Sequence, residues 1–139
     1  MTWPLDTTVV SGLRKAPGGR ANANVVAWAE RQTATSLHMS VVTILELEPG
    51  VLSKERRDAA QRAVLRRWLD GRVVPAFADR IPPVDASVAR RWAQLQVPDR
   101  MPERDAWIAA TALVHGFTVV TRNGADFVAS GAAWLDPWN

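Results

Sequence analysis

The sequence ERDAWIAATALVHGFTVVT, residues 103–121, joins a helix pattern directly to a strand pattern. Apolar residues recur at helical spacing from Glu103 to His115, and Gly116 is the residue type that most often ends a helix. The β-branched run from Phe117 to Thr121 that follows is typical of a buried strand. A helix that leads within one turn into a buried strand indicates an α/β fold.

The same alternation runs through the rest of the chain. Short apolar runs predict further strands at 3–5, 37–42, 73–77 and 133–135, of which 73–77 lies at a sheet edge because it contains a proline. Spacing and capping residues predict helices at 8–15, 22–32, 43–52, 54–69, after the N-cap Asp85, and at 125–129. This order predicts a mainly parallel sheet covered on both faces, with its site beyond the carboxyl ends of the strands.

Composition narrows the possible classes of protein. The 139 residues have no linker or internal repeat, so we expect a single domain over residues 1–139. No apolar run could span a membrane and the N-terminus lacks a signal pattern, so we expect a cytoplasmic protein. The absence of cysteine excludes disulfides, thiolate metal sites and cysteine nucleophiles, and a cysteine-free chain suits a reducing compartment.

The basic residues are almost all arginine. Of 17 basic residues only Lys15 and Lys54 are lysines, against 14 acidic residues. Arginine suits two-pronged contacts to phosphate. If several of the acidic residues gather at one site, the remaining surface is strongly basic, which is a suitable layout for binding a polyanion.

Two acidic residues in the first half of the chain are candidates for a site. Asp6 follows the first strand, where Thr7 and Thr8 can orient it, although it could equally be the N-cap of the next helix. Glu46 completes a capping-box pattern with Thr43, so capping is the alternative to a chemical role.

Three more candidates lie in the second half. Asp105 heads an apolar helix stripe, and burying its charge alone costs several kcal/mol, so it needs a cation: Arg104, Arg122 or a metal ion. Spacing alone favours the ion pair. Asn123 and Asp126 both follow a strand and precede a helix, and either could be a cap or turn residue.

Taken together, these acidic residues sit where predicted strands end or helices begin. Carboxylates about 4 Å apart repel by roughly 4 kcal/mol at an effective dielectric of 20, so a cluster needs a cation or raised pKa values. Oxygen ligands without Cys or His favour Mg²⁺ or Mn²⁺ over zinc. Such ions can activate water for attack on a phosphodiester.

Several segments, in order, resemble the PIN-domain ribonucleases, in particular the VapC/FitB-like toxins of toxin–antitoxin pairs. The segments are LDTTVVS (5–11), SVVTILEL (40–47), DAWIAATA (105–112), HG (115–116), VTRN (120–123), DF (126–127) and DPW (136–138). The resemblance covers nearly the whole chain and implies a three-layer α/β/α sandwich and a metal-dependent endoribonuclease of the VapBC type. It places the acidic metal ligands at Asp6, Glu46 and Asp105.

The chain departs from the family pattern at two positions. Thr8 stands where the family has Asn, and Asn123 occupies the fourth acidic position, which leaves Asp126 as a possible substitute. Family analogy also implies an RNA substrate, a cognate antitoxin protein and a homodimer.

Two other readings compete with a nuclease. A catalytically weak or silent PIN-like domain that binds RNA or a protein is one alternative, suggested by Asn123. A phosphatase of the haloacid-dehalogenase type also begins with a strand-end Asp, but it requires a second Asp where this chain has Thr8.

Overall fold

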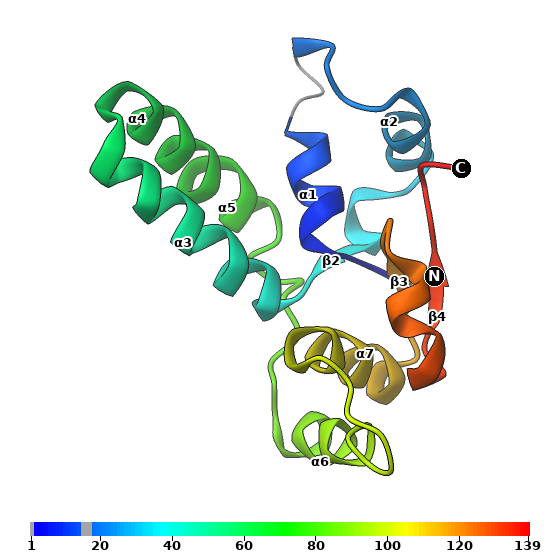
Figure 1. Ribbon diagram of the computed structural model, residues 1–139. Helices are drawn as coiled ribbons and strands as arrows, with labels where there is room; N and C mark the ends of the chain where they lie inside the picture. Colours follow the sequence, from blue (N-terminus) through cyan, green and yellow to red (C-terminus); the bar gives the residue numbers. More distant parts are fainter. Residues whose placement is uncertain (1, 15–17) are drawn as a thin grey trace.

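A four-stranded parallel sheet forms the centre of the computed structural model, which describes residues 2–14 and 18–139 (Figure 1). The strands, in the spatial order β2-β1-β3-β4, are β2 (Leu37–Met39), β1 (Trp3–Leu5), β3 (Thr118–Val120) and β4 (Ala133–Leu135). Parallel pairing brings all four carboxyl ends to one edge. The two central strands, β1 and β3, are far apart in sequence, so their ends join distant parts of the chain.

Helices fill the crossovers between these strands. Between β1 and β2 lie α1 (Thr7–Leu13), α2 (Ala23–Glu30) and the 3₁₀ turn η2 (Ala34–Ser36). Between β2 and β3 lie α3 (Val41–Arg57), α4 (Ala59–Trp68), the π-helical turn η3 (Leu69–Val73), α5 (Val74–Ala76), α6 (Ala86–Gln94) and α7 (Glu103–His115). The 3₁₀ segment η4 (Gly124–Ser130) connects β3 to β4.

Each face of the sheet has its own hydrophobic core. Leu5 and Val120 belong to a core shared with α1, α2, α3 and η3. Val119, whose side chain points to the opposite face, packs with Ile108 of α7 and Phe127 of η4. The predicted three-layer α/β/α sandwich is therefore confirmed, and the hydrophobic effect fixes both helix layers against the sheet.

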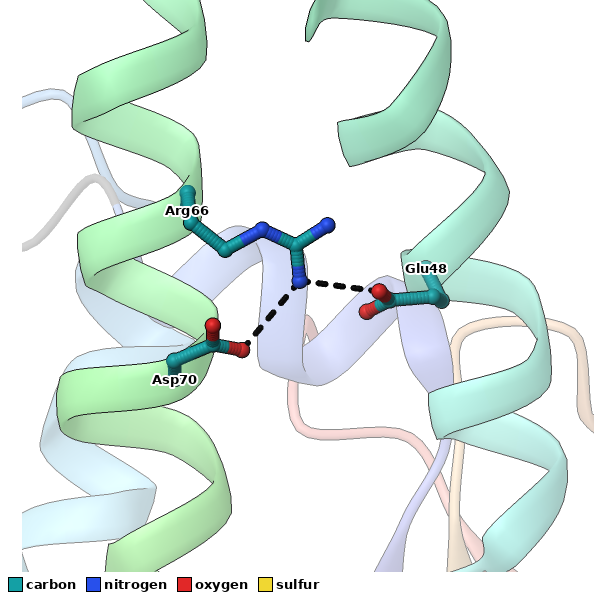
Figure 2. A network of polar contacts seen from close by, with 3 residues as sticks. All are labelled: Glu48, Arg66 and Asp70. Carbon is teal, nitrogen blue, oxygen red and sulfur yellow. Dashed lines mark hydrogen bonds and ion pairs between the residues drawn. The ribbon is translucent and has the colours of Figure 1, made fainter.

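Helices α3 and α4 form a hairpin that extends away from the sheet (Figure 1). Figure 2 shows how the two arms are joined: one guanidinium nitrogen of Arg66 lies 2.8 Å from Glu48 on α3 and 3.3 Å from Asp70 in η3. All three side chains are partly exposed, so solvent screens these ion pairs. The contacts fix the angle of the hairpin more than they stabilise the fold.

Several predicted elements have different boundaries. The strand predicted at 73–77 is wrong, because Val73 ends η3 and residues 74–76 form α5. Leu69 and Val73 face the same core at helical spacing. Pro75 fits near the start of α5, where no N–H donor is needed. Residues 40–42 of the expected strand 37–42 also leave the sheet, since Ser40 caps a helix that begins at Val41.

Other helix predictions need smaller corrections. The break expected near Ser53 lies at Asp58, whose carboxylate caps α4. The last helix is a 3₁₀ segment, and residue 15 of the first predicted helix lies outside the described residues. Within residues 2–14 and 18–139, no helix is long and apolar enough to cross a membrane.

Two capping predictions are confirmed. Gly116 ends α7 with a φ of 71°, in the left-handed region that glycine enters without a steric penalty. Asp85 caps α6 by accepting a hydrogen bond from the backbone N–H of Val88 at 3.0 Å.

Candidate active site

Asp6 lies at the centre of the carboxyl edge of the sheet. It directly follows β1, and its backbone N–H donates to the carbonyl of Val120 at the end of β3, at 3.0 Å. The residue is only 7% exposed. A carboxylate this deeply placed needs hydrogen-bond donors or a cation to offset its lost hydration.

Three donors hold the Asp6 carboxylate in one orientation. Oδ1 accepts from the Thr8 hydroxyl at 2.6 Å and from the backbone N–H of Val9 at 3.1 Å. Oδ2 accepts from the buried Thr121 hydroxyl at 2.5 Å. Asp6 is therefore the N-cap of α1, as the alternative interpretation predicted, and it is also a rigidly oriented carboxylate at the sheet edge.

Glu46 projects from α3 toward the same edge. Its Oε1 accepts from the Thr7 hydroxyl at 2.9 Å, and its Oε2 lies 3.7 Å from the Arg104 guanidinium. The capping-box interpretation is wrong, because α3 begins at Val41 and places Thr43 inside the helix, where its buried hydroxyl lies 3.4 Å from that of Thr7. Thr7 thus orients Glu46, whereas only Thr8 of the two predicted threonines orients Asp6.

Asp105, in the first turn of α7, provides the clearest sign that the acidic residues converge. Burial raises the pKa of its carboxyl above the ordinary value of 3.8, and the negative charges of Asp126, Glu46 and Asp6 raise it further. Water and dissolved ions screen distant charges strongly, so this effect indicates that Asp126, Glu46 and Asp6 lie near Asp105.

The ion pair predicted for Asp105 is absent from the described part of the chain. Arg104 pairs with Glu46 instead, and the Arg122 guanidinium lies over the Trp138 ring. No other described Lys, Arg or His lies within ion-pair distance of Asp105. Its negative charge therefore remains without a protein cation beside it.

Asn123 and Asp126 lie together after β3. The Asn123 backbone N–H donates to the Thr121 hydroxyl at 3.0 Å, and the Asp126 N–H donates to the Asn123 carbonyl at 3.0 Å. Among the carboxylates acting on Asp105, Asp126 has the largest influence. Asp126 is thus the fourth acidic residue of the cluster, with Asn123 beside it.

The donor chemistry of this cluster fits a hard divalent cation, but the side chains are not arranged as a closed cage. All candidate ligands are carboxylate or amide oxygens, and a cation would offset the repulsion that raises the pKa of Asp105. Among residues 2–14 and 18–139, no group of three or more His, Asp or Glu side chains is placed to hold a metal ion.

An open groove leads away from the cluster between α3 and α7. We name it the acidic groove, because Glu46, Glu103 and Asp105 line it with Arg104 as the single basic residue among those described. Trp107 lines the same groove and stacks on Trp92 of α6 with ring centroids 5.2 Å apart. This side of the site therefore has a net negative lining.

Residues 5–129 match the sequence model of the PIN domain. The chain belongs to the PIN-domain family. This PIN domain is 36% identical to VapC ribonuclease Y4jK of Sinorhizobium fredii, covering 96% of each chain, and 35% identical to Toxin FitB of Neisseria gonorrhoeae, covering 97% of each. Its fold matches the crystal structure of FitAcB from Neisseria gonorrhoeae with a TM-score of 0.89 and 32% identity over 99% of both chains.

The PIN-domain resemblance inferred from the sequence segments is thereby confirmed. Sequence reasoning predicted that Thr8 orients Asp6, but it missed the parts played by Thr121 and Thr43. Thr121 is fully buried and bridges Asp6 to the Asn123 backbone, and Thr43 is buried beside Thr7. A polar residue directly after a β-branched strand, as at Thr121, is the one signal that could have indicated such a role.

Proposed function

We propose that residues 1–139 form one PIN domain that acts as a Mg²⁺- or Mn²⁺-dependent endoribonuclease, the toxin of a VapBC-type toxin–antitoxin pair. The observation that carries the proposal is that Asp126, Glu46 and Asp6 lie near enough to Asp105 for their negative charges to raise the pKa of its carboxyl. The similarity to chains named VapC ribonuclease and Toxin FitB supports RNA as the substrate and an antitoxin as the partner. A homodimer completes the proposal.

The four carboxylates are the groups that would hold the cation. When bound, Mg²⁺ or Mn²⁺ supplies a Lewis acid that activates water and offsets the charge developing on the phosphodiester. Thr8 and Thr121 keep both oxygens of Asp6 fixed, and Thr7 holds Oε1 of Glu46. Because these donors are already in place, little reorganisation is needed at Asp6 and Glu46 when substrate binds.

The surroundings of Asp105 raise the pKa of its carboxyl. Its raised pKa means that it holds a proton at Oδ more readily than an ordinary Asp does, and a nearby cation reverses this preference. Arg104, paired with Glu46, balances part of the negative charge on the α3 side. The proton on Asp105 and the positive charge of Arg104 thus both reduce the negative charge of the site.

The test is cleavage of a mixed RNA pool by the purified protein with Mg²⁺ or Mn²⁺. We expect cleavage that is lost with EDTA, in Asp105→Asn and in Asp6→Asn, but retained in Asp99→Asn, which alters an exposed carboxylate outside the cluster. Cleavage that persists in EDTA or in Asp105→Asn would contradict a metal–carboxylate nuclease.

The alternative is a PIN domain that binds RNA or a protein with little or no catalysis. Asn123 in place of an acidic residue and the open arrangement of the carboxylates favour it. A protein that binds RNA but cleaves nothing with either metal would support this alternative over the nuclease.

A further inference from the structure

A second groove begins near Asp6, at Thr8 and Asn123. It has a volume of about 690 Å³. We name it the basic groove, and its lining comes from α1, the residues before α2, the turn after β3 and the C-terminal segment, and includes Thr8, Arg20, Asn22, Arg122, Asn123 and Trp138.

Hydrogen bonds connect the basic groove directly to Asp6. Thr8, which lines the groove, donates its hydroxyl to Asp6 Oδ1. Asn123, which also lines the groove, donates its backbone N–H to the Thr121 hydroxyl, which in turn donates to Asp6 Oδ2. A ligand whose reacting group reaches Asp6 therefore lies at the mouth of this groove.

The two grooves differ sharply in charge. No described residue that lines the basic groove is acidic, and neither Arg20 nor Arg122 makes an ion pair with a described residue. The acidic groove, in contrast, is lined by three carboxylates. A polyanion that extends from Asp6 is therefore attracted into the basic groove and repelled from the acidic groove.

Arg122 is held in position by an aromatic ring. Its guanidinium lies 5.2 Å from the centroid of Trp138, which limits its motion and leaves its N–H donors available to the groove. Trp138 is fixed in turn, because its carbonyl accepts from Asn24 Nδ2 at 2.8 Å and its ring lies over Gly12, where a Cβ would come within 3.6 Å. The Arg122 guanidinium is therefore held in place before any ligand binds.

The basic lining continues beyond this groove. Arg20 also lines a neighbouring groove with Arg14, Arg67 and Arg72, again without an acidic residue among the described lining. A strand that enters at Asp6 thus meets arginines over a longer path than the basic groove alone provides.

We propose that the basic groove binds the sugar–phosphate backbone of single-stranded RNA next to the scissile phosphate, with Arg20 and Arg122 each contacting a phosphate. This inference rests on the proposed nuclease function, because it is the reacting phosphate at Asp6 that puts the neighbouring nucleotides into the groove. Arginine forms paired hydrogen bonds with phosphate oxygens, and such contacts position a strand without reading its sequence.

The test measures binding of a fluorescent 12-nucleotide RNA in EDTA, so that cleavage does not interfere. We expect Arg20→Gln and Arg122→Gln each to weaken binding about threefold to tenfold and to lower the slope of log K against log salt by about 0.7, the value for one phosphate contact on a single strand. Arg90→Gln, which removes an exposed arginine of α6, is the matched control and should leave both quantities unchanged.

Photocrosslinking of the same RNA carrying 5-iodouridine locates the strand independently. Trypsin separates residues 105–122, which contain Trp107 of the acidic groove, from residues 123–139, which contain Trp138. Crosslinks in 123–139 support the basic groove. Crosslinks to Trp107 in 105–122, with none in 123–139, overturn it.

The outcomes distinguish this inference from the proposed function. If the parent protein cleaves RNA while both arginine variants bind it with parental affinity and salt slope, the nuclease stands and the groove assignment is wrong. If the variants lose affinity but the parent cleaves nothing, the groove stands and the nuclease is wrong. If the parent neither binds nor cleaves RNA, both are wrong, and an acidic protein segment becomes the better occupant.

Discussion

At the scale of single residues, Thr121 connects the sheet to the site more directly than any other residue described. Its hydroxyl donates to Asp6 and accepts from the Asn123 backbone N–H in a fully buried position. Replacing it with the isosteric valine leaves both partners without this bond. We expect Thr121→Val to lower the free energy of unfolding by about 1–3 kcal/mol and the RNA cleavage rate by roughly tenfold or more.

Urea denaturation and cleavage assays on Thr121→Val and Thr121→Ser separate the two effects. Serine retains the hydroxyl and loses only a methyl group, so it should retain most of the activity while losing about 1 kcal/mol of stability. Equal activity in the valine and serine variants would show that the hydrogen bond to Asp6 has no catalytic consequence.

Asp105 gives the fold a pH dependence of defined sign. Its pKa is raised in the folded state, so between the ordinary value of 3.8 and the folded value the native protein binds more protons than the unfolded chain. Stability therefore falls as the pH rises through this range, and the cost persists at neutral pH. We expect Asp105→Asn, which cannot ionise, to unfold at a higher temperature than the parent at pH 7 in EDTA.

The same comparison at low pH provides the check. Below the ordinary pKa of Asp, both states of the parent are protonated at Asp105, so the difference in melting temperature between the two proteins should shrink toward zero. A stabilisation that does not change between pH 3 and pH 7 would point to a packing effect rather than to relief of charge repulsion.

The sequence indicated which residues belong to the site better than it indicated which residues they contact. The positions of Asp6 and Asp105 at predicted element ends, with the family pattern, identified the acidic residues that gather at the sheet edge. The partners of Glu46 could not be found in this way, because Thr7 and Arg104 reach it across α1, α3 and α7. Such contacts depend on how helices pack, which no local pattern records.

At the scale of elements, we expect replacement of glycine by alanine to have opposite effects at two positions. Gly116 ends α7 in the left-handed conformation, whereas Gly50 lies inside α3, and an added Cβ would meet nothing within 4 Å at either position. We expect Gly116→Ala to destabilise the fold by about 1 kcal/mol and Gly50→Ala to stabilise it by about 0.5–1 kcal/mol. The open surroundings remove steric clash as an explanation for either result.

Urea unfolding of the two variants provides the measurement, and each serves as the control for the other. Because both changes add one methyl group to open space, a difference of about 1.5 kcal/mol between them reflects backbone conformation alone. A shift of the same sign in both variants would rule out this explanation.

The boundaries of elements depended on packing that local patterns do not reveal. The run at 73–77 has strand-forming residues, yet Val73 continues the buried face that α4 and η3 present to the core. A hydrophobic run of four or five residues fits a buried strand and a buried helix end equally well. Helix α7 was predicted correctly because its apolar spacing and its terminal glycine agree.

At the scale of the whole molecule, alternation of helices and strands predicted a parallel sheet but not its order. The order β2-β1-β3-β4 places β1 beside β3, so Asp6 and Thr121 meet although 115 positions separate them in the sequence. Sequence spacing contains no information on this pairing. The site is therefore a product of topology, because parallel strands bring ends that are remote in the chain to one edge.

A metal ion bound at that edge links the stability of the whole domain to the site. A cation that binds only the folded protein stabilises it by about 2.7 kcal/mol at one hundred times its dissociation constant. We expect added Mn²⁺ to raise the melting temperature of the parent, and Asp6→Asn and Asp105→Asn to abolish the rise. The control Glu30→Gln, at the far end of α2, should respond as the parent does.

A Mn²⁺ titration can also show which residue is the fourth ligand of the metal site. Asp126 acts on Asp105 more strongly than the other carboxylates do, so Asp126→Asn should weaken Mn²⁺ binding about tenfold, whereas Asn123→Asp should strengthen it by adding a carboxylate oxygen. If Asn123→Asp leaves the affinity unchanged or lowers it, Asn123 lies outside the metal site. If Asp126→Asn has no effect either, three acidic residues hold the ion, and Asp126 influences Asp105 only through its charge.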